Sequence, residues 1–396
     1  MEIKITNKLE LGPLMTFELS KEKPIHGWFW YKEGYAPEIV EYAVKRYSER
    51  KKEKNQELNP ETILDPFCGA GTTLLAAKSA RIASVGVDAS PLAVFVSKTK
   101  TQDYEKKDLE GVQTFLTKKI EPAPKEMDWG FELFDARAAF PKRNYNEILA
   151  IRNAIEQEEG KSRDLLLLAL LSILPQASII LKDGGVLKIQ KEKRALPAKE
   201  IFRRKVKRMI RELEQFQVYG HVPQVCLGDA RALDMEKESI DLVITSPPYL
   251  NNIDYSKIYG LELSLLNMSK SEASEMRMRA VRSFIRTGDR GLAEGSEMPP
   301  EVGEIGFRIP IIGTYFKDME GSISEMFGVL RPGGEAHITV SNSVIHETHV
   351  LVDELLAEIG LRIGFSDSEI VVGAERIADV RPQKVRTRES IVILRK

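Results

Sequence analysis

Apolar residues recur along the chain at two spacings, and these predict alternating strands and helices. The first residues, Met1–Thr6, alternate like a strand, and Pro37 stands where a helix with apolar residues at helical spacing begins. Further on, a strand at Thr62–Asp65, a glycine-containing turn, a helix from Thr72 and a strand at Ala83–Asp88 form a βαβ unit. Its parallel strands predict a doubly wound α/β sheet.

A second group of short apolar strands follows much later in the chain. We expect these strands at Gln224–Leu227, Ile240–Thr245, Glu335–Val340, Ser368–Val372 and Ser390–Leu394, with a helix at Val350–Glu358. Between the two groups, helical patterns cover 145–157, 164–181 and 200–216. The sequence therefore predicts the two halves of one sheet domain, 1–100 and 223–396, separated by a helical insertion at 101–222.

The most apolar stretch, Leu165–Leu181, has 13 apolar residues among 17 and is bounded by Asp164 and Lys182. A membrane-spanning helix needs about 20 apolar residues. We therefore expect a buried helix with a possible bend at Pro175, and no membrane partner.

Composition narrows the class of protein. The 396 residues are 42% hydrophobic and 30% charged, with 58 basic and 59 acidic side chains, so an anionic partner must meet a local patch. Two distant cysteines, Cys68 and Cys226, exclude a disulfide framework, and a reducing cytoplasm is the expected compartment. The five histidines are scattered or form an isolated pair, and we predict no metal site.

The predicted helix at 200–216 is amphipathic and strongly basic. Its apolar stripe is Phe202, Val206, Met209, Leu213 and Phe216, and Arg204, Lys205, Lys207, Arg208 and Arg211 occupy the remainder. Residues 182–211 hold 12 Lys or Arg against 3 acids, which favours a phosphate backbone as partner over a merely solvated helix. The loop-rich stretch 271–310, with Arg282 and Arg286, is a second candidate contact surface or a flap.

Candidate chemistry begins at Asp65-Pro-Phe-Cys-Gly-Ala-Gly-Thr72. The glycines allow a tight turn that a ligand can approach closely, at the carboxyl end of a strand. Asp88 follows 23 residues after Asp65, near the spacing at which an acid binds ribose hydroxyls. The pattern indicates a nucleotide-like cofactor, and Leu74 in place of a third glycine disfavours a dinucleotide.

The segment Thr245-Ser-Pro-Pro-Tyr249 is the most specific in the chain. Two consecutive prolines fix φ and remove two N–H donors, so that the loop offers hydrogen-bond acceptors. Ser246 adds a hydroxyl, and Tyr249 offers a flat ring for stacking. This combination suits an exocyclic amino group on an aromatic base.

Together the two motifs resemble those of the S-adenosylmethionine-dependent amino-methyltransferases, in particular the N4-cytosine branch of the DNA-modification-methylase family, which has archaeal relatives acting on ribosomal RNA. His26–Tyr35 resembles that family's N-terminal cofactor motif, Val225–Ala230 its adenine-side segment and Leu330–Gly334 the turn before its fifth strand. The resemblance implies a Rossmann-like class I methyltransferase with a mostly parallel seven-stranded sheet. Along the chain, the cofactor-binding motif comes first, the helical insertion follows, and the catalytic motif comes last.

The resemblance also implies roles for individual residues. Asp88 would bind the ribose hydroxyls and Asp229 would accept from the adenine amino group. The implied cofactor-binding set is Tyr31, Asp65, Phe67, Cys68, Gly69, Gly71, Thr72, Asp88, Asp229 and Ala230, and the implied catalytic set is Ser246, Pro247, Pro248 and Tyr249. Both cysteines are expected to be packing residues, and no covalent enzyme intermediate is implied.

Three functions remain open at this point. We favour cytosine N4 methylation of small-subunit ribosomal RNA, because the chain resembles the archaeal ribosome-modifying relatives and the insertion shows no groove-reading motif. The alternatives are a DNA N4-cytosine methyltransferase and a cofactor-binding regulator without catalysis. The number of methyl groups added stays open, as does the oligomeric state.

Overall fold

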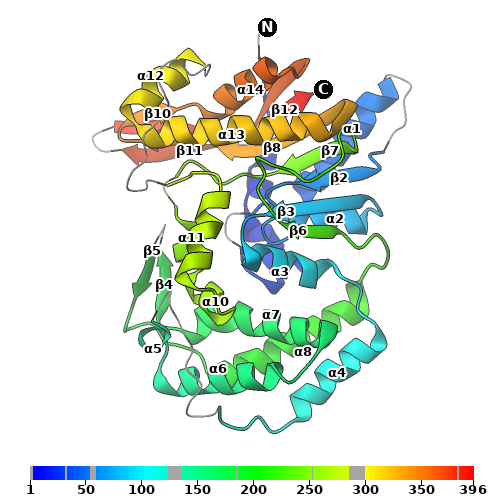
Figure 1. Cartoon of the computed structure of the whole chain (residues 1–396), viewed down its shortest axis with the longest axis vertical. Helices are drawn as coiled ribbons and strands as arrows, with labels where there is room; N and C mark the ends of the chain where they lie inside the picture. The colour runs from blue at the N-terminus through cyan, green and yellow to red at the C-terminus, as the bar shows by residue number, and fades with distance from the viewer. Residues whose placement is uncertain are drawn as a thin grey trace.

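The computed structural model describes residues 3–31, 34–53, 59–123, 135–183, 186–251, 253–284, 299–380 and 383–396 (Figure 1). The strands are β1 Lys4–Asn7, β2 Thr62–Asp65, β3 Ala83–Asp88, β4 Ile180–Asp183, β5 Val186–Ile189, β6 Gln224–Leu227, β7 Ile240–Thr245, β8 Leu330–Ser341, β9 Ser343–Ile345, β10 Thr348–Val350, β11 Asp367–Val380 and β12 Gln383–Arg395. The α-helices are α1 Glu38–Glu53, α2 Thr72–Ser79, α3 Pro91–Thr101, α4 Lys106–Thr117, α5 Ala136–Ala139, α6 Lys142–Ile155, α7 Gly160–Ala177, α8 Ala198–Phe216, α9 Tyr255–Ile258, α10 Gly260–Leu265, α11 Lys270–Arg279, α12 Pro300–Arg308, α13 Pro310–Val329 and α14 Val352–Ile363. Three short 3-10 helices, Leu9–Met15, Phe17–Lys21 and His26–Trp28, precede α1.

An eight-stranded sheet with the order β1-β11-β12-β8-β7-β2-β3-β6 forms the centre of the protein. All neighbouring strands are parallel except the pairs that β12 makes with β11 and β8. The chain order runs outward in opposite directions from the β2–β7 pair, which makes this pair the topological switch point where open α/β sheets bind ligands. The predicted Rossmann-like class is confirmed, with β1 as an eighth strand beside β11.

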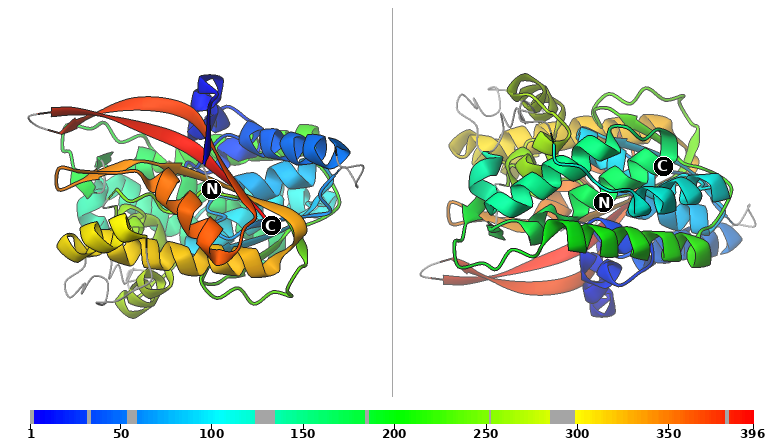
Figure 2. Two further views of the ribbon diagram at one scale, coloured as in Figure 1. Left: turned by 90° about the horizontal axis from the view of Figure 1, so that it is seen from above. Right: turned by 90° about the horizontal axis from the view of Figure 1, so that it is seen from below.

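Successive residues of the central strands pack against opposite layers. Ile63, Leu242 and Ile244 face the cluster that contains α1, whereas Leu64 and Val243 face the cluster that contains α13 and α14. This alternation is what the period of two in a strand requires. Seen from above, α1 and α13 lie on opposite sides of the sheet (Figure 2). Helices therefore cover both faces and leave the carboxyl ends of the strands for a site.

The segment between β3 and β6 forms a helical layer below the sheet, in which α7 is the central helix (Figure 1). Its residues Leu165–Leu171 are buried, and α4, α6 and α8 pack around it. The same hydrophobic cluster includes Trp28, Phe29 and Tyr259 from outside the segment. The prediction of a buried helix here is confirmed, and no helix among the described residues is long and apolar enough to cross a membrane.

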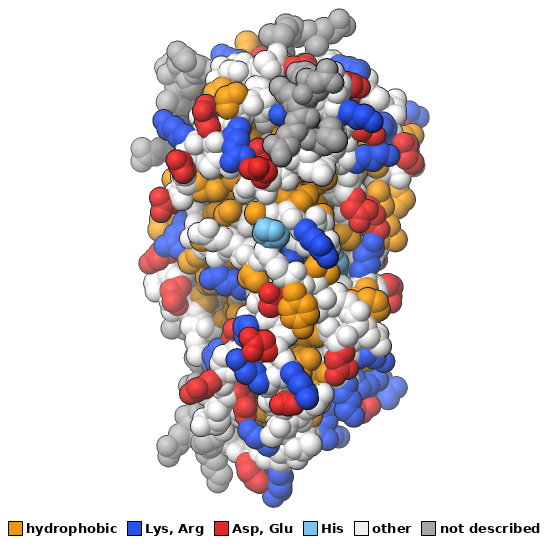
Figure 3. All heavy atoms as spheres, turned by 90° about the vertical axis from the view of Figure 1, so that its right-hand side faces the viewer, with side chains coloured by type: hydrophobic (Ala, Val, Ile, Leu, Met, Phe, Trp, Pro, Cys, Tyr) orange, Lys and Arg blue, Asp and Glu red, His pale blue; other side chains and the backbone are white. Residues whose placement is uncertain are grey.

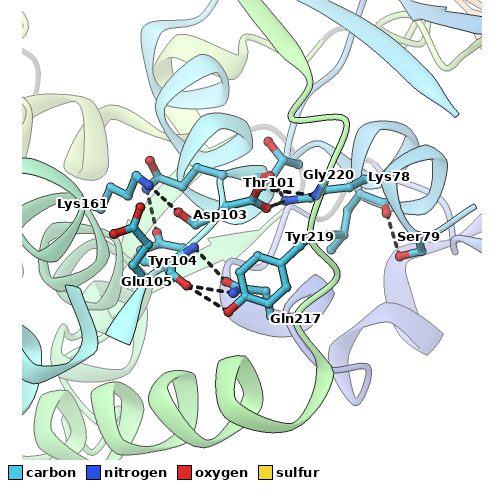
Figure 4. A network of polar contacts seen from close by, with 12 residues as sticks. Lys78, Ser79, Thr101, Asp103, Tyr104, Glu105, Lys161, Gln217, Tyr219 and Gly220 are labelled. Carbon is cyan, nitrogen blue, oxygen red and sulfur yellow. Dashed lines mark hydrogen bonds and ion pairs between the residues drawn. The ribbon is translucent and has the colours of Figure 1, made fainter. Parts of the chain in front are cut away.

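The two ends of the helical insertion are fastened together beside α3 (Figure 4). Lys78 Nζ donates to Asp103 Oδ1 at 2.6 Å, and Lys161 Nζ donates to the Asp103 carbonyl at 2.6 Å. The Gln217 side-chain amide makes two hydrogen bonds to the backbone of Tyr104, at 3.0 and 2.9 Å. The carbonyl and the amino group of the Gln217 side chain are thus both bonded to Tyr104. These two hydrogen bonds hold the start and the end of the insertion at a fixed distance from each other.

Sequence patterns misplaced some elements. The stretch 271–310, expected to be rich in loops, contains most of α11 and all of α12. Residues 330–334, expected as a turn, belong to β8, at the point where the register between β8 and β7 shifts. Phe216, placed on the apolar stripe, is 52% exposed because α8 ends there, beyond its packing partners.

Helix α8 also anchors the N-terminal segment through one buried carboxylate. Glu212 Oε2 accepts from the Ile25 backbone N–H and from Trp28 Nε1, each at 2.8 Å, and Oε1 accepts from Arg208 Nε at 2.5 Å. Glu212 is 7% exposed and Trp28 is fully buried. The carboxylate thus satisfies two buried N–H groups of the segment that precedes Tyr31.

We expect Glu212→Ala to lower the free energy of unfolding by about 3 kcal/mol, because it leaves two buried N–H donors and the Arg208 guanidinium without their acceptor. Urea denaturation of the variant against wild type measures the loss. Glu214→Ala, an exposed position on the same helix, is the matched control. Equal stability of the Glu212 and Glu214 variants would contradict the anchoring role.

Candidate active site

The turn after β2 has the tight backbone that its glycines predicted. Gly69 and Gly71 have φ values of +49° and +74°, and a Cβ on Gly71 would lie 2.9 Å from Ser97 Oγ. Ser97 Oγ donates to the Gly69 carbonyl and Lys100 Nζ donates to the Ala70 carbonyl, both at 2.8 Å. Helix α3 therefore holds the turn from behind and leaves its other side open to a ligand.

Asp88 lies at the carboxyl end of β3 beside this turn. Its carboxylate accepts from Gly69 N–H at 2.9 Å and from Ser90 N–H at 2.8 Å. Burial raises the pKa of Asp88 to about 6, against the lowering effect of the backbone hydrogen bonds. Both oxygens keep free lone pairs, so the group is oriented to accept further hydrogen bonds.

Asp65 lies at the centre of a buried polar network that joins β2 to β7. Its oxygens accept from Thr245 Oγ1 at 2.6 Å, from Thr73 Oγ1 at 2.5 Å and from Phe67 N–H at 3.1 Å. The Tyr35 phenol oxygen lies 2.6 Å from Thr73 Oγ1. Burial raises the pKa of Asp65 to about 6. The carboxylate thus fixes the turn relative to the end of β7.

Tyr31 closes the site from the N-terminal segment. Its ring stacks on Tyr259 with centroids 4.8 Å apart and an interplanar angle of 8°. Its edge lies 3.5 Å from the position that a Cβ of Gly69 would occupy. Lys182 Nζ lies 4.2 Å from the centroid of the Tyr259 ring. The insertion, which contains Lys182, therefore also contacts this pair of rings.

The proline-containing loop follows β7 directly, so its position is set by the switch point. Tyr249 Oη donates to Glu389 Oε1 at 2.9 Å, and Glu389 Oε2 accepts from Arg376 Nη2 at 2.8 Å. The side chain of Ser246 lines the same cavity as Tyr249 and Glu389. Burial raises the pKa of Tyr249 well above its ordinary value, and the nearby Glu389 charge adds to the rise.

The glycine turn and the proline loop border one cavity of about 550 Å³. The predicted residues that line it are Tyr31, Asp65, Phe67, Cys68, Gly69, Thr72, Asp88, Ala230, Ser246, Pro247, Pro248 and Tyr249. Two predicted residues do not line it. Gly71 shapes the turn from behind, and Asp229 directs its carboxylate to Arg231, whose Nε and Nη2 lie 2.9 and 2.7 Å from its oxygens.

The predicted nucleic-acid residues do not all lie on one open face. Arg204, Lys207 and Arg211 are exposed on α8. Lys205 Nζ instead donates to the Gly27 carbonyl at 3.3 Å, and burial lowers its pKa to about 8, while Arg208 pairs with Glu212. Arg282 is partly buried beside α13, and Arg286 lies outside the described residues.

On the face drawn in Figure 3, basic side chains gather in one local patch. Figure 3 shows Lys and Arg gathered toward the lower right of one face, at the level of the helical insertion, and both signs interspersed elsewhere on that face. Among the described residues, no group of three His, Cys, Asp or Glu side chains could hold a metal ion. Cys68 is buried behind the turn, and Cys226 is partly buried.

Several site residues were missed by sequence reasoning. Thr73 follows the first motif and Thr245 begins the second, so their hydroxyls could have been noticed there. Tyr35 ends the segment His26–Tyr35 but was given no role there, Tyr255 and Tyr259 follow the proline loop, and Arg376 and Glu389 come from the last two strands; all five line the cavity. No local signal marks Arg376 and Glu389, because only the order of the strands brings them to the site.

Comparisons with known proteins find relatives that align over most of the chain. No family model matches it. The type II methyltransferase M.BsoBI of Geobacillus stearothermophilus is 25% identical, with 97% of this chain and 88% of the relative covered. M.AvaI of Nostoc is 24% identical, covering 91% of this chain and 83% of the relative, and M.MjaII of Methanocaldococcus jannaschii is 34% identical over 22% of this chain and 15% of the relative.

The chain is an S-adenosylmethionine-dependent methyltransferase. Among solved structures, a methyltransferase from Methanosarcina mazei is similar at 9% identity and a TM-score of 0.30, covering 87% of this chain and 96% of that chain. A Thermus thermophilus protein described as a DNA modification methylase has 17% identity and a TM-score of 0.23, covering 43% and 52%. The assignment rests on the sequence relatives and on the strand order.

The residues present fit this cofactor. S-adenosylmethionine supplies an electrophilic methyl group on a sulfonium. The glycine turn would allow close backbone approach, Asp88 would offer its partly buried carboxylate to the ribose hydroxyls, and Thr72 would stand near the cofactor carboxylate at the N-terminus of α2. Phe67 and Tyr31 supply apolar walls on either side of the turn.

We expect Asp88→Asn to weaken S-adenosylmethionine binding at least tenfold at pH 8, because an amide oxygen accepts less strongly than a carboxylate. The pKa of Asp88 is raised to about 6, so wild-type affinity holds above that pH and falls by up to tenfold per pH unit below it. Isothermal titration calorimetry measures both effects. The variant loses this part of the pH dependence, and Asp234→Asn, at an exposed position, keeps the wild-type curve. Unchanged affinity in Asp88→Asn would contradict the assignment.

Proposed function

We propose that this methyltransferase transfers a methyl group to the exocyclic N4 amino group of cytosine in DNA. The observation that carries the proposal is that the acceptor loop Ser246–Tyr249 and the glycine turn with Asp88 line one cavity. A methyl donor held at the turn and an amino group held at the loop would therefore share one enclosed space.

The loop suits an amino group that is a weak nucleophile. The lone pair of cytosine N4 is delocalised into the ring, and hydrogen bonds from the amino group to the Ser246 hydroxyl and the Pro247 carbonyl favour a more tetrahedral nitrogen. Catalysis then depends on position and electrostatics without a covalent enzyme intermediate. Tyr249 would stack on the target base, which must leave its helical stack to enter the cavity.

Two findings favour cytosine and DNA. The Ser-Pro-Pro-Tyr form of the loop resembles the N4-cytosine branch of the family. The relatives that align over 91% or more of this chain are type II methyltransferases, which act on DNA. The preference for ribosomal RNA in the sequence analysis has no support among these relatives, and the DNA alternative takes its place.

The chemistry is tested by incubating the purified protein with methyl-labelled S-adenosylmethionine and unmodified genomic duplex DNA or ribosomal RNA. Mass spectrometry of the nucleosides is expected to find N4-methylcytosine in DNA. Tyr249→Ala should weaken base stacking by about 1–3 kcal/mol, roughly a 5- to 150-fold loss of kcat/KM, without loss of cofactor affinity. Methyladenine as the product, or label in RNA alone, would overturn the proposal.

The exposed cations of α8 provide a second test, of the nucleic-acid surface. If Arg204, Lys207 and Arg211 contact phosphates, changing all three to Gln should reduce the slope of log K for DNA binding against log salt by about 3. Fluorescence anisotropy with a labelled duplex measures the slope. The matched control changes Lys106, Lys107 and Lys119, which are 91%, 75% and 86% exposed on another part of the insertion. An equal slope in both triple variants would contradict the role of α8.

A further inference from the structure

Glu389 reaches the cavity from β12, far along the chain from either motif. Only 4% of its surface is exposed, and it lines the cavity together with Ser246 and Tyr249. Because β12 runs antiparallel to β8, its first half lies at the edge of the sheet where the parallel strands end, with Glu389 opposite Ser341 at the end of β8. The antiparallel strand therefore delivers a carboxylate to the site.

Three oxygen atoms lead from the proline loop to this carboxylate: Ser246 Oγ, Tyr249 Oη and Glu389 Oε1. Ser246 and Tyr249 stand three residues apart in one loop and line one cavity, and Tyr249 Oη donates to Glu389 Oε1 at 2.9 Å. The other carboxylate oxygen accepts from Arg376 Nη2 at 2.8 Å. Both hydroxyls can accept one proton while they donate another, so the chain can pass a proton without leaving a charge on an intermediate oxygen.

We propose that Glu389 is a positioning residue that receives, through Ser246 and Tyr249, the proton that the target amino group releases. The inference rests on the proposed function, because it assumes an amino group bound at Ser246. It adds to that function by naming Glu389 as the acceptor of the proton that the amino group releases.

The proton balance of methyl transfer requires such an acceptor. The nitrogen lone pair forms the new N–C bond as the C–S bond breaks with its electron pair on sulfur, which leaves the nitrogen with one proton too many. That proton passes to Ser246 Oγ, the serine proton passes to Tyr249 Oη, and the phenol proton passes to Glu389 Oε1. The carboxylate ends protonated, and solvent removes this proton between turnovers.

The surroundings of Glu389 suit a proton acceptor. Burial raises the pKa of Glu389 above its ordinary value, and this effect outweighs Arg376 and Tyr249, which both lower it. Those are the charged and titratable groups facing it from β11 and from the loop after β7, and Ser341 on β8 does not titrate. Arg376, with its side chain 54% exposed, still favours the ionised form at neutral pH.

A purely structural role for Glu389 makes different predictions. The carboxylate could serve only to orient the Tyr249 ring for stacking. Glu389→Gln separates the two roles, because an amide oxygen still accepts the phenol hydrogen bond but cannot take up a proton. Tyr249→Phe is the complementary change, since it keeps the ring and removes the hydroxyl.

The test measures kcat and KM for DNA methylation from pH 5 to 9 in wild type, Glu389→Gln, Tyr249→Phe and the double variant. Each single change is expected to lower kcat about a hundredfold with KM and cofactor affinity within twofold, and the double variant should lose no more than either single one. The kcat of wild type should fall at low pH as Glu389 becomes protonated, and Glu389→Gln should lack this limb. Glu375→Gln, on the neighbouring strand and 51% exposed, is the matched control.

Wild-type kcat and an unchanged pH profile in Glu389→Gln would overturn the relay, as would losses that multiply in the double variant. A readout independent of turnover uses 3-fluorotyrosine placed at position 249. Its ¹⁹F shift should follow a titration with a midpoint above the usual glutamate pKa, and this titration should be absent in Glu389→Gln. If wild type makes N4-methylcytosine but Glu389→Gln keeps its kcat and its ¹⁹F titration, the relay alone is refuted. If wild type makes no N4-methylcytosine, the proposed function is refuted.

Discussion

The carboxylate of Asp65 accepts hydrogen bonds from Thr73 and Thr245 at the place where β2 and β7 diverge. This contact joins the two motifs, because Asp65 opens the glycine turn and Thr245 opens the proline loop. A buried carboxylate with several donors is costly to leave unpaired, so the two loop origins are held in one relative position. The distance between the cofactor turn and the acceptor loop depends on this pairing.

The helical insertion takes part in building the site as well as offering a basic surface. Glu212 on α8 holds Ile25 and Trp28 of the N-terminal segment, and Tyr259 below the sheet stacks on Tyr31. One wall of the cavity is thus made by a segment that packs on the helices between β3 and β6. Of the basic residues of α8, Lys205 and Arg208 contribute to this packing, whereas Arg204, Lys207 and Arg211 remain exposed.

The catalytic edge also receives residues from the antiparallel end of the sheet. β11 and β12 form a long hairpin whose strands carry Arg376 and Glu389 to the proline loop. A doubly wound sheet places the carboxyl ends of parallel strands at its ligand-binding edge. An antiparallel strand in such a sheet instead presents its beginning there, which explains how Glu389, seven positions before Lys396, enters the site.

The sequence by itself determined the βαβ unit, the turn at Gly69 and Gly71, the acid at Asp88 and the loop Ser246–Tyr249. Each of these follows from neighbouring residues, because φ restrictions, side-chain period and strand ends act within a few positions. The tertiary structure alone decided that Asp65 is engaged by Thr245, that Asp229 pairs with Arg231 away from the cavity, and that Glu389 meets Tyr249. These contacts join residues brought together by strand order, helix packing or side-chain direction, for which the local pattern carries no signal.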